Sequence, residues 1–381
     1  NSIAFFIANV KFLLKVRGGL RYNGGMEQPL SAAARAELLN GLPALLLPWY
    51  DTNKRDLPWR ENRDPYRVLV SELMLQQTRV EAVREHYVRF LRELPDVQAL
   101  AACPEDKLFK LWEGLGYYSR ARNLQRAAQA ICEHGFPQTA EGLKKLPGVG
   151  EYTAGAVASI AFEQPSPAVD GNVVRVLSRY LGDARPAAEL RKALAVELTP
   201  AYPAGRCGDF TQSLMELGAT VCVPSSPLCL TCPLFAGCRT KSDALPLPEK
   251  KPERRKERVT LLLFRAGERV ALCRRESGVL RGMYAFYTEE RTLTEGEIAR
   301  RLAAAGASDA QIGLPTAHRH VFTHIEREMR AYPVSCGGRE AEIAAAFGVT
   351  FYPLAKVREE LSLPSAYRWA LRLFGDRAGE I

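Results

Sequence analysis

The spacing of apolar and polar positions divides the chain into two regions. From Leu30 to about Leu217, apolar residues recur at helical spacing and are interrupted by glycine and proline, which predicts many short helices. Residues 241–258 (KSDALPLPEKKPERRKER) are rich in proline and charge, as is typical of a solvated linker. Beyond them the pattern indicates strands at Thr260–Phe264 and Val270–Cys273, and a helix near 295–305. We therefore expect an all-α region followed by a smaller α+β domain.

The chain of 381 residues is long enough for two or three domains. The pattern assigns residues 26–240 to the helical domain, 241–258 to the linker and 259–375 to the C-terminal domain. Residues 1–25 are expected to be an upstream extension or disordered tail, with Met26 as the start of the protein proper. Their apolar stretch is too short to span a bilayer and lacks a signal-peptide cleavage pattern.

Charge and cysteine usage narrow the class of partner. The formal net charge is +9 and the pI is about 9.1, so the surface attracts polyanions, and nucleic acid is the natural candidate. Because 52 basic residues face 43 acidic ones, that attraction must come from clustering. Five of the nine cysteines are scattered, which suits a reducing cytosol better than a disulfide framework. A cytoplasmic protein without a membrane partner is expected.

The other four cysteines form the most specific motif in the chain. Cys222, Cys229, Cys232 and Cys238 are spaced C-x6-C-x2-C-x5-C in one loop that also contains several prolines. Four thiolates from a single loop can saturate a tetrahedral metal or an iron-sulfur cluster. A structural zinc usually takes two C-x2-C pairs, and only Cys229 and Cys232 form one, so the spacing favours a cluster over zinc.

A glycine-containing turn between two predicted helices is a candidate phosphate site. The segment LKKLPGVGEYTAGA (143–156) contains the run Pro147, Gly148, Val149 and Gly150. In such a hairpin, backbone amides and the start of the following helix can hold an anionic oxygen. A glycine turn between helices is usually only structural, but the adjacent Lys144 and Lys145 favour phosphate.

Two carboxylates have sequence environments suited to opposite roles. Asp170, in VDGNV, is expected to be a helix N-cap that accepts amide hydrogens and stays ionised. Asp64 and Pro65 predict the start of a helix running past Val80, and Glu72 would lie inside it among apolar neighbours, with a raised pKa. Alone, such a glutamate is more often a buried residue satisfied by an arginine or an amide. Together, a neutral and an ionised carboxyl form the usual pair for breaking a glycosidic bond.

These motifs together resemble the helix-hairpin-helix DNA glycosylases, and within them the MutY-type adenine glycosylases. The resemblance rests on LPWR (57–60), SELMLQQT (71–78), GLGYYSRARNL (114–124), the hairpin, VDGNV and the four-cysteine loop. It implies an all-α catalytic region of two helical subdomains that carries a 4Fe-4S cluster. The implied substrate is adenine mispaired with 8-oxoguanine or guanine in double-stranded DNA.

The resemblance also implies roles for individual residues. Glu72 is similar to the acid that protonates adenine N7 and later helps activate water, Asp170 to the group facing the cationic sugar, and Asn172 to a residue supporting the site. The lyase members of the superfamily carry a Schiff-base lysine where this chain has Tyr152, which implies base removal without strand cleavage.

Further residues match those that handle the DNA. Adenine must be rotated out of the duplex to be reached, and Gln77 and Tyr117 are similar to the residues that fill the gap. Trp59 and Arg60 are similar to residues lining the adenine pocket.

The C-terminal region resembles the Nudix-like domain of the same proteins. SGVLRGMYAFY (277–287) is similar to its signature, with departures at Met283, Ala285 and Tyr287. The glutamate-rich magnesium helix of a working Nudix hydrolase does not follow, so a lesion reader is expected. The run Phe322, Thr323 and His324 is similar to the family's contact with oxidised guanine. The alternative for the histidines at 318, 320 and 324 is a metal site, but they lack a carboxylate or cysteine at ligand spacing.

The leading hypothesis is a monomeric, monofunctional adenine DNA glycosylase, associated with the nucleoid of a bacterial cytoplasm. The alternatives are an endonuclease III-like bifunctional glycosylase and lyase, and a non-catalytic DNA-binding protein or nucleotide pyrophosphatase. Tyr152 and the C-terminal domain disfavour the lyase, intact Glu72 and Asp170 disfavour a silent binder, and the missing magnesium helix disfavours the pyrophosphatase.

Overall fold

The computed structural model describes residues 30–248, 253–276 and 281–375. It divides into two compact units, the first made of the described residues up to 87 together with 126–248, and the second made of 88–125 together with the described residues from 253 onward. The sequence groups 88–125 with the helical domain, so the domain boundaries stay a prediction. The expected extension at 1–25 lies outside the described residues.

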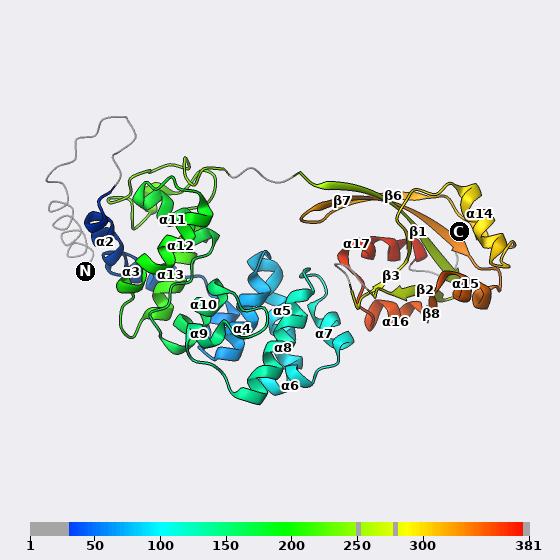
Figure 1. Ribbon diagram of the computed structural model, residues 1–381, viewed down its shortest axis with the longest axis horizontal. Coiled ribbons are helices and arrows are strands. Elements are labelled where there is room, and N and C mark those ends of the chain that lie inside the picture. Colours follow the sequence, from blue (N-terminus) through cyan, green and yellow to red (C-terminus); the bar gives the residue numbers. More distant parts are fainter. Residues whose placement is uncertain (1–29, 249–252, 277–280, 376–381) are drawn as a thin grey trace. The chain divides into compact units, whose positions relative to one another are not determined.

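The regular elements among the described residues up to Thr220 are all helices, as the apolar spacing predicts. The helices that lie wholly in the first unit are α2 (Ala32–Asn40), α3 (Leu42–Asn53), η1 (Pro58–Arg60), α4 (Pro65–Leu75), α9 (Ala140–Leu143), α10 (Glu151–Phe162), α11 (Gly171–Leu181), α12 (Ala187–Glu197), η2 (Thr199–Ala201), α13 (Cys207–Thr220) and η3 (Cys229–Thr231). The second unit contains α6 (Val97–Ala102) and α7 (Glu105–Trp112), while α5 (Val80–Glu93) and α8 (Ser119–His134) have residues in both (Figure 1).

Helix α10 is the centre of the first unit. Its residues from Thr153 to Ile160 are all buried, as expected for a helix that is apolar on every side. It packs against α4 and α13, and α13 in turn packs against α11 and α3. One contact of α10 is backbone to backbone: a Cβ added at Gly155 would lie 2.2 Å from the carbonyl oxygen of Pro167. Only glycine allows this approach, which brings the segment before Asp170 against α10.

The predicted helix from Pro65 past Val80 is wrong at its far end. Asp64 caps the start as expected, accepting a hydrogen bond from the amide of Arg67 at 2.9 Å. The helix stops at Leu75, Gln77 has φ of +55°, and α5 begins at Val80. The four residues between the helices occupy about one helical turn, so the apolar spacing continues across the break and hides it.

The C-terminal part of the second unit is built on one eight-stranded sheet. Its strands are β1 (Arg255–Ala266), β2 (Arg269–Arg274), β3 (Tyr284–Ala285), β4 (Tyr287–Glu289), β5 (Gln311–Ile312), β6 (Thr316–Val321), β7 (Ile325–Ser335) and β8 (Thr350–Pro353). Strand β1 pairs in parallel with β7, from Arg255 opposite Ile325 to Arg265 opposite Ser335, and β6 and β7 form an antiparallel hairpin (Figure 1).

Helices cover both faces of this sheet. One core contains residues of α14 (Glu295–Ala304) and α15 (Glu340–Phe347). The core on the opposite face contains residues of α16 (Leu354–Glu359), α17 (Ser365–Arg368) and η4 (Trp369–Phe374). The alternating apolar residues of β1 point into both cores, since Leu261 and Leu263 belong to one and Leu262 and Phe264 to the other. The predicted strands and the helix near 295–305 are confirmed.

The predicted linker is wrong over its last four residues. Residues 255–258 belong to β1, although their charges suggest a solvated segment. Ion pairs with β7 hold them there: Arg258 with Glu328 at 2.9 Å and Glu257 with Arg327 at 2.6 Å. The charges that suggest a linker are therefore cross-strand partners.

None of the helices in the described part of the chain has the length and apolar character needed to cross a membrane.

Candidate active site

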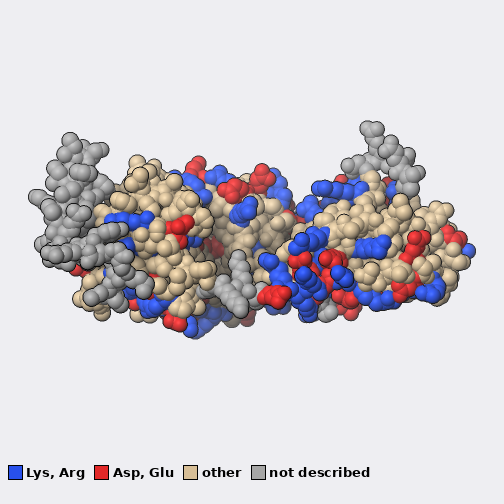
Figure 2. Space-filling view, turned by 90° about the horizontal axis from the view of Figure 1, so that it is seen from above, with Lys and Arg blue, Asp and Glu red and all other residues tan. Residues whose placement is uncertain are grey.

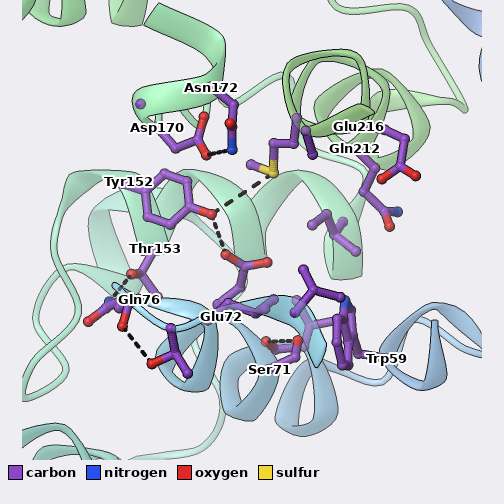
Figure 3. Close-up of a pocket in the computed structure, with 18 of the residues that line it drawn as sticks. Trp59, Ser71, Glu72, Gln76, Tyr152, Thr153, Asp170, Asn172, Gln212 and Glu216 are labelled. Atoms are coloured by element: carbon purple, nitrogen blue, oxygen red, sulfur yellow. Dashed lines mark hydrogen bonds between the residues drawn. The ribbon is translucent and has the colours of Figure 1, made fainter. Parts of the chain in front are cut away.

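A cavity with a volume of about 730 Å³ lies in the first unit. It is bordered by η1, α4, the turn at 76–78, the start of α10, the start of α11 and α13 (Figure 3). Predicted site residues line much of it: Trp59, Arg60, Glu72, Gln77, Gly148, Gly150, Tyr152, Asp170 and Asn172. Its size is within the range of small-molecule pockets. Pro147 and Val149 are not among its lining residues.

Glu72 projects from α4 into this cavity and is only 6% exposed. Burial raises its pKa to about 7; a hydrogen bond from Tyr152 opposes the rise, the negative charge of Asp170 adds to it, and Arg60 opposes it. The burial and the direction of the shift are as the sequence predicts. The hydrogen-bond partner of this carboxyl is the phenol of Tyr152, whereas the purely structural alternative predicted an arginine or an amide.

Tyr152 has a contact that the sequence does not reveal. Its hydroxyl donates to Glu72 Oε2 at 2.6 Å and lies 3.9 Å from the sulfur of Met215 (Figure 3). Burial, with the nearby carboxylates, raises the pKa of Tyr152 well above its ordinary value, so the phenol stays protonated and remains a donor. The sequence singles out Tyr152 only because it replaces the lysine of the lyase members. The structure shows in addition that Tyr152 contacts Glu72, the candidate acid, directly.

Asp170 is the N-cap of α11, as predicted. Its carboxylate accepts hydrogen bonds from the amide of Val173 at 2.7 Å and from Asn172 Nδ2 at 2.8 Å (Figure 3). Burial raises the pKa of Asp170, although these donors and the nearby Arg175 act to lower it. The expectation that Asp170 stays ionised remains a prediction. Asp170 differs from Glu72 in having these donors, which favour its ionised form.

Asn172 is held from the opposite side by Arg175. The Arg175 guanidinium donates from Nη2 to Asn172 Oδ1 and to the carbonyl of Gly218, each at 2.8 Å, and from Nε to the carbonyl of Cys222 at 2.8 Å. Gly218 allows the close packing, since a Cβ there would lie 2.5 Å from that of Asn172. The side chain that supports Asp170 is thus fixed by α13 and the cysteine loop.

A buried ion-pair network borders the cavity beside Trp59. Glu216 of α13 accepts hydrogen bonds from Arg55 at 2.7 Å and from Arg60 at 2.8 Å. Although burial raises the pKa of Glu216, these bonds outweigh it and lower the pKa to about 2. Trp59 is fixed by an edge contact with Tyr87, with ring centroids 5.6 Å apart. The sequence pointed to Trp59 and Arg60 but not to Glu216, which carries no motif of its own.

Other lining residues that the sequence did not single out contribute polar groups. Gln76 Nε2 donates to Thr153 Oγ1 at 3.1 Å. Figure 3 also shows Ser71 and Gln212 among the lining side chains. Ser71 belongs to the SELMLQQT motif (71–78), but the sequence assigns it no role. Nothing in the sequence distinguishes Gln212.

The glycine hairpin leaves room for a ligand backbone. Gly148 has φ of +76°, and a Cβ built at Gly150 would meet nothing within 4 Å. Gly150 is the N-cap of α10 and has no side chain to cap the first-turn amides. The Val149 amide is already used, because it donates to the carbonyl of Leu146. Figure 2 shows Lys and Arg interspersed with Asp and Glu on the face it presents.

Both predicted gap-filling residues have a left-handed backbone. In the first unit, Gln77 has φ of +55° and lines the cavity. In the second unit, Tyr117 has φ of +47° and is 45% exposed. Such strain in a non-glycine residue persists only where the surroundings fix it, and it concentrates at functional sites.

The predicted lesion-contact run forms the turn between β6 and β7. The Phe322 amide donates to the carbonyl of Ile325 at 2.7 Å, and the Arg327 guanidinium lies 5.7 Å from the Phe322 ring centroid. Thr323 is exposed and its hydroxyl is 2.6 Å from that of Tyr117, within the second unit. Thr323 and Tyr117, the second predicted gap-filling residue, are therefore in direct contact.

Two other features of the C-terminal part bear on the predictions. His318 stacks on Trp369 and His320 contacts Phe322 edge-on.

Of the Nudix-like signature, residues 277–280 lie outside the described part of the chain, whereas Met283 and Ala285 are fully buried. The departures from the signature therefore include core positions.

The four loop cysteines line one small cavity together with Arg179 and Lys241. Cys222 Sγ is 3.5 Å from Arg179 Nη1, and Cys238 Sγ is 3.4 Å from the Arg179 carbonyl. All four are free thiols. Among the described residues, no group of three or more His, Cys, Asp or Glu side chains is arranged to hold a single metal ion.

Comparisons with known proteins agree with this geometry. Residues 70–201 match the family described as HhH-GPD superfamily base excision DNA repair protein. The chain is 49% identical over 212 residues to an adenine DNA glycosylase of Mus musculus, covering 51% of this chain and 40% of the relative. It is 37% identical over 199 residues to one from Buchnera aphidicola subsp. Baizongia pistaciae, covering 51% and 57%. Among solved structures, a thermostable thymine-DNA glycosylase is similar at 30% identity and a TM-score of 0.50, over 54% of this chain and 97% of that one.

The chain therefore belongs to the HhH-GPD superfamily of base excision DNA repair proteins. Within that superfamily, the curated relatives confirm its resemblance to the MutY-type adenine DNA glycosylases. The chain spans about half the length of these relatives, 40% in one case and 57% in the other.

Proposed function

We propose that the protein is a monofunctional DNA glycosylase that removes adenine mispaired with 8-oxoguanine or guanine. The observation that carries the proposal is that Glu72 and Asp170 line one cavity, close enough for the charge of Asp170 to raise the pKa of Glu72. Breaking the bond between a purine and a deoxyribose needs a proton donor on the base and a negative group near the sugar.

Glu72 is the proton donor. With a pKa of about 7, a large fraction of its carboxyl is protonated at neutral pH. It transfers its proton to N7 of adenine as the bond from C1′ to N9 breaks, and the electron pair of that bond leaves with the base. The resulting carboxylate then takes a proton from the water that adds to C1′. The products are free adenine and an abasic site.

Asp170 stabilises the positive sugar. Its anionic form is supported by the Val173 amide and by Asn172, which fix the carboxylate before the reaction starts. It acts on C1′ by charge or by transient covalent attachment. Tyr152 occupies the position of the lyase lysine and its phenol is committed to Glu72, so no Schiff base with the abasic sugar forms.

The surrounding residues hold the DNA. Trp59 and Arg60 border the pocket that receives adenine, and Gln77 and Tyr117 fill the gap in the duplex. The hairpin from Pro147 to Gly150 binds a backbone phosphate through amides at the start of α10.

The β6–β7 turn reads the opposite base. Phe322 packs beside the oxidised guanine, and Thr323 and His324 bind its edge by hydrogen bonds. The sheet with helices on both faces supports a Nudix-like identity for this domain, acting in recognition and not in hydrolysis.

The cysteine loop is proposed to hold a 4Fe-4S cluster. Cys222, Cys229, Cys232 and Cys238 fit, because they are free thiols that line one cavity. When bound, a cluster would hold these four cysteines together and so organise the loop, and it would supply no chemistry to base removal. Its presence would appear as iron and sulfide in the purified protein.

A monomer in the cytoplasm stays a prediction. The relatives come from an animal and a bacterium, so association with a bacterial nucleoid does not follow from them.

The test is incubation of the protein with duplexes carrying adenine opposite 8-oxoguanine, with and without alkali. Strand breaks that form only after alkali support the proposal, and release of free adenine identifies the product. Breaks without alkali would indicate an endonuclease III-like lyase. Binding without adenine release would indicate a non-catalytic protein, and Glu72→Gln serves as the inactive control.

A further inference from the structure

The loop that carries Tyr117 is held in an unusual backbone conformation. Gly114, Gly116 and Tyr117 have φ of +106°, +69° and +47°. The two glycines adopt positive φ at little cost, but a tyrosine does not. Tyr117 also exposes 45% of its surface, so burial of its ring does not hold it in place. Something else in the second unit must stabilise this conformation.

Arg120, in the first turn of α8, lies under this loop. It is 8% exposed, and its Nη2 donates to the carbonyls of Leu115 at 2.9 Å and Gly116 at 3.2 Å. The Trp112 indole donates to the same Gly116 carbonyl at 3.1 Å. The backbone immediately before Tyr117 is thus fixed by a guanidinium and an indole.

The same guanidinium contacts the aromatic rings. Its central carbon is 5.3 Å from the Tyr117 ring centroid and 5.6 Å from that of Trp112. These distances are within the range of cation–π attraction. Burial lowers the pKa of Arg120 to about 10, which still leaves it charged at neutral pH. The far end of the ring is fixed separately, by the hydroxyl of Thr323 at 2.6 Å.

We propose that Arg120 is a positioning residue that keeps Tyr117 aimed as a preformed wedge, so that the duplex meets a fixed ring and not a mobile one. This inference rests on the proposed function, in which Tyr117 fills the gap left by the flipped base. An arginine suits this place, because its Nη2 donates to two carbonyls while the central carbon of the flat group lies near both ring centroids. Lysine keeps the charge but has neither the fork nor the plane.

A double-mutant cycle between Arg120→Lys and Tyr117→Ala tests the inference. Base flipping is followed by stopped-flow fluorescence of 2-aminopurine next to an uncleavable fluorinated adenosine opposite 8-oxoguanine. Single-turnover release of adenine is measured in parallel on the cleavable duplex. Arg126→Lys, at an exposed position on the same helix, is the matched control.

Arg120→Lys is expected to slow flipping and adenine release by about tenfold, from the loss of stacking and one hydrogen bond. In the Tyr117→Ala background the same substitution should have no further effect, because the side chain on which it acts is gone. Arg126→Lys should match the parent protein in both assays.

Two results would overturn the inference: full flipping rates in Arg120→Lys, or the same tenfold loss with and without Tyr117. If Arg120→Lys is not folded by circular dichroism, Arg120→Gln, which keeps a donor for the carbonyls, replaces it. Unfolding of both would show that Arg120 serves the stability of α8 instead. A parent protein that flips the base but releases no adenine would refute the proposed function while leaving the flipping cycle interpretable.

Discussion

Removing the Tyr152 hydroxyl should shift the pH dependence of adenine release. In Tyr152→Phe the ring remains, but Glu72 loses the 2.6 Å hydrogen bond that lowers its pKa. A hydrogen bond to a charged group contributes about 1.5–3 kcal/mol, and one pKa unit corresponds to about 1.4 kcal/mol. The pKa of Glu72 should therefore rise by about one to two units above its value of about 7.

The sign of the effect on rate follows from the role of Glu72 as an acid. The protonated carboxyl is the donor, so adenine release is fastest below its pKa and declines as the pH rises through about 7. In Tyr152→Phe the same decline should begin about one to two pH units higher. The variant then loses proportionally less of its activity between pH 7 and pH 8.5 than the parent, on the order of tenfold less.

The assay is single-turnover adenine release from the 8-oxoguanine duplex, measured from pH 5.5 to pH 9.5 with the protein in excess. Tyr202→Phe is the matched control, because it removes a tyrosine hydroxyl bonded to Thr211 at 2.9 Å outside the cavity lining. An unchanged alkaline decline in Tyr152→Phe, or one moved to lower pH, would refute the role of Tyr152 in setting the pKa of Glu72.

Three further changes test other parts of the site. The folded state raises the pKa of Glu72 from 4.5 to about 7, so the stability linked to its proton is complete below pH 4.5 and is lost as the pH rises through 7. Glu72→Gln should therefore increase the free energy of unfolding by about 3 kcal/mol at pH 8 and by little at pH 4, in denaturant titrations, while abolishing adenine release; equal effects at both pH values would contradict this. Thr323→Ala combined with His324→Ala should lower the preference for 8-oxoguanine over guanine opposite adenine by about tenfold, measured as a ratio of single-turnover rates; a preserved ratio would remove the lesion-reading role. Gly218→Ala should displace Asn172 and reduce adenine release by about 100-fold with duplex binding retained; an unchanged rate would show that Asn172 can move without cost.

The helical region was predictable where local chemistry decides the structure. The N-caps Asp64 and Asp170 and the burial of Glu72 follow from spacing and residue type. The end of α4 does not, because the chain leaves the helix at a left-handed Gln77, and a left-handed glutamine has no sequence signature. The start of β1 was missed because its charges are satisfied by β7, about 70 residues away.

In the candidate site, the sequence predicted mainly the two carboxylic acids, Glu72 and Asp170. The raised pKa of Asp170 could not be anticipated, because the sequence shows its hydrogen-bond donors but not the depth of its burial. Glu216 could not be anticipated, since its importance comes from Arg55 and Arg60, which are distant in sequence. The bond between Tyr152 and Glu72 joins two helices whose packing the sequence does not specify.

The close approach of Gly155 to Pro167 has a consequence for robustness. Tyr152 lies one helical turn before this glycine and Asp170 three residues after this proline, so a main-chain contact helps to set the spacing between two residues proposed to act in catalysis. Main-chain atoms have no rotamers to change. Hydrophobic substitutions in the neighbouring core can therefore alter side-chain packing without altering that spacing. A methyl group added at Gly155 would push α10 away from the segment at Pro167 that leads into α11. Small displacements of catalytic groups of this kind can strongly reduce the rate of a reaction.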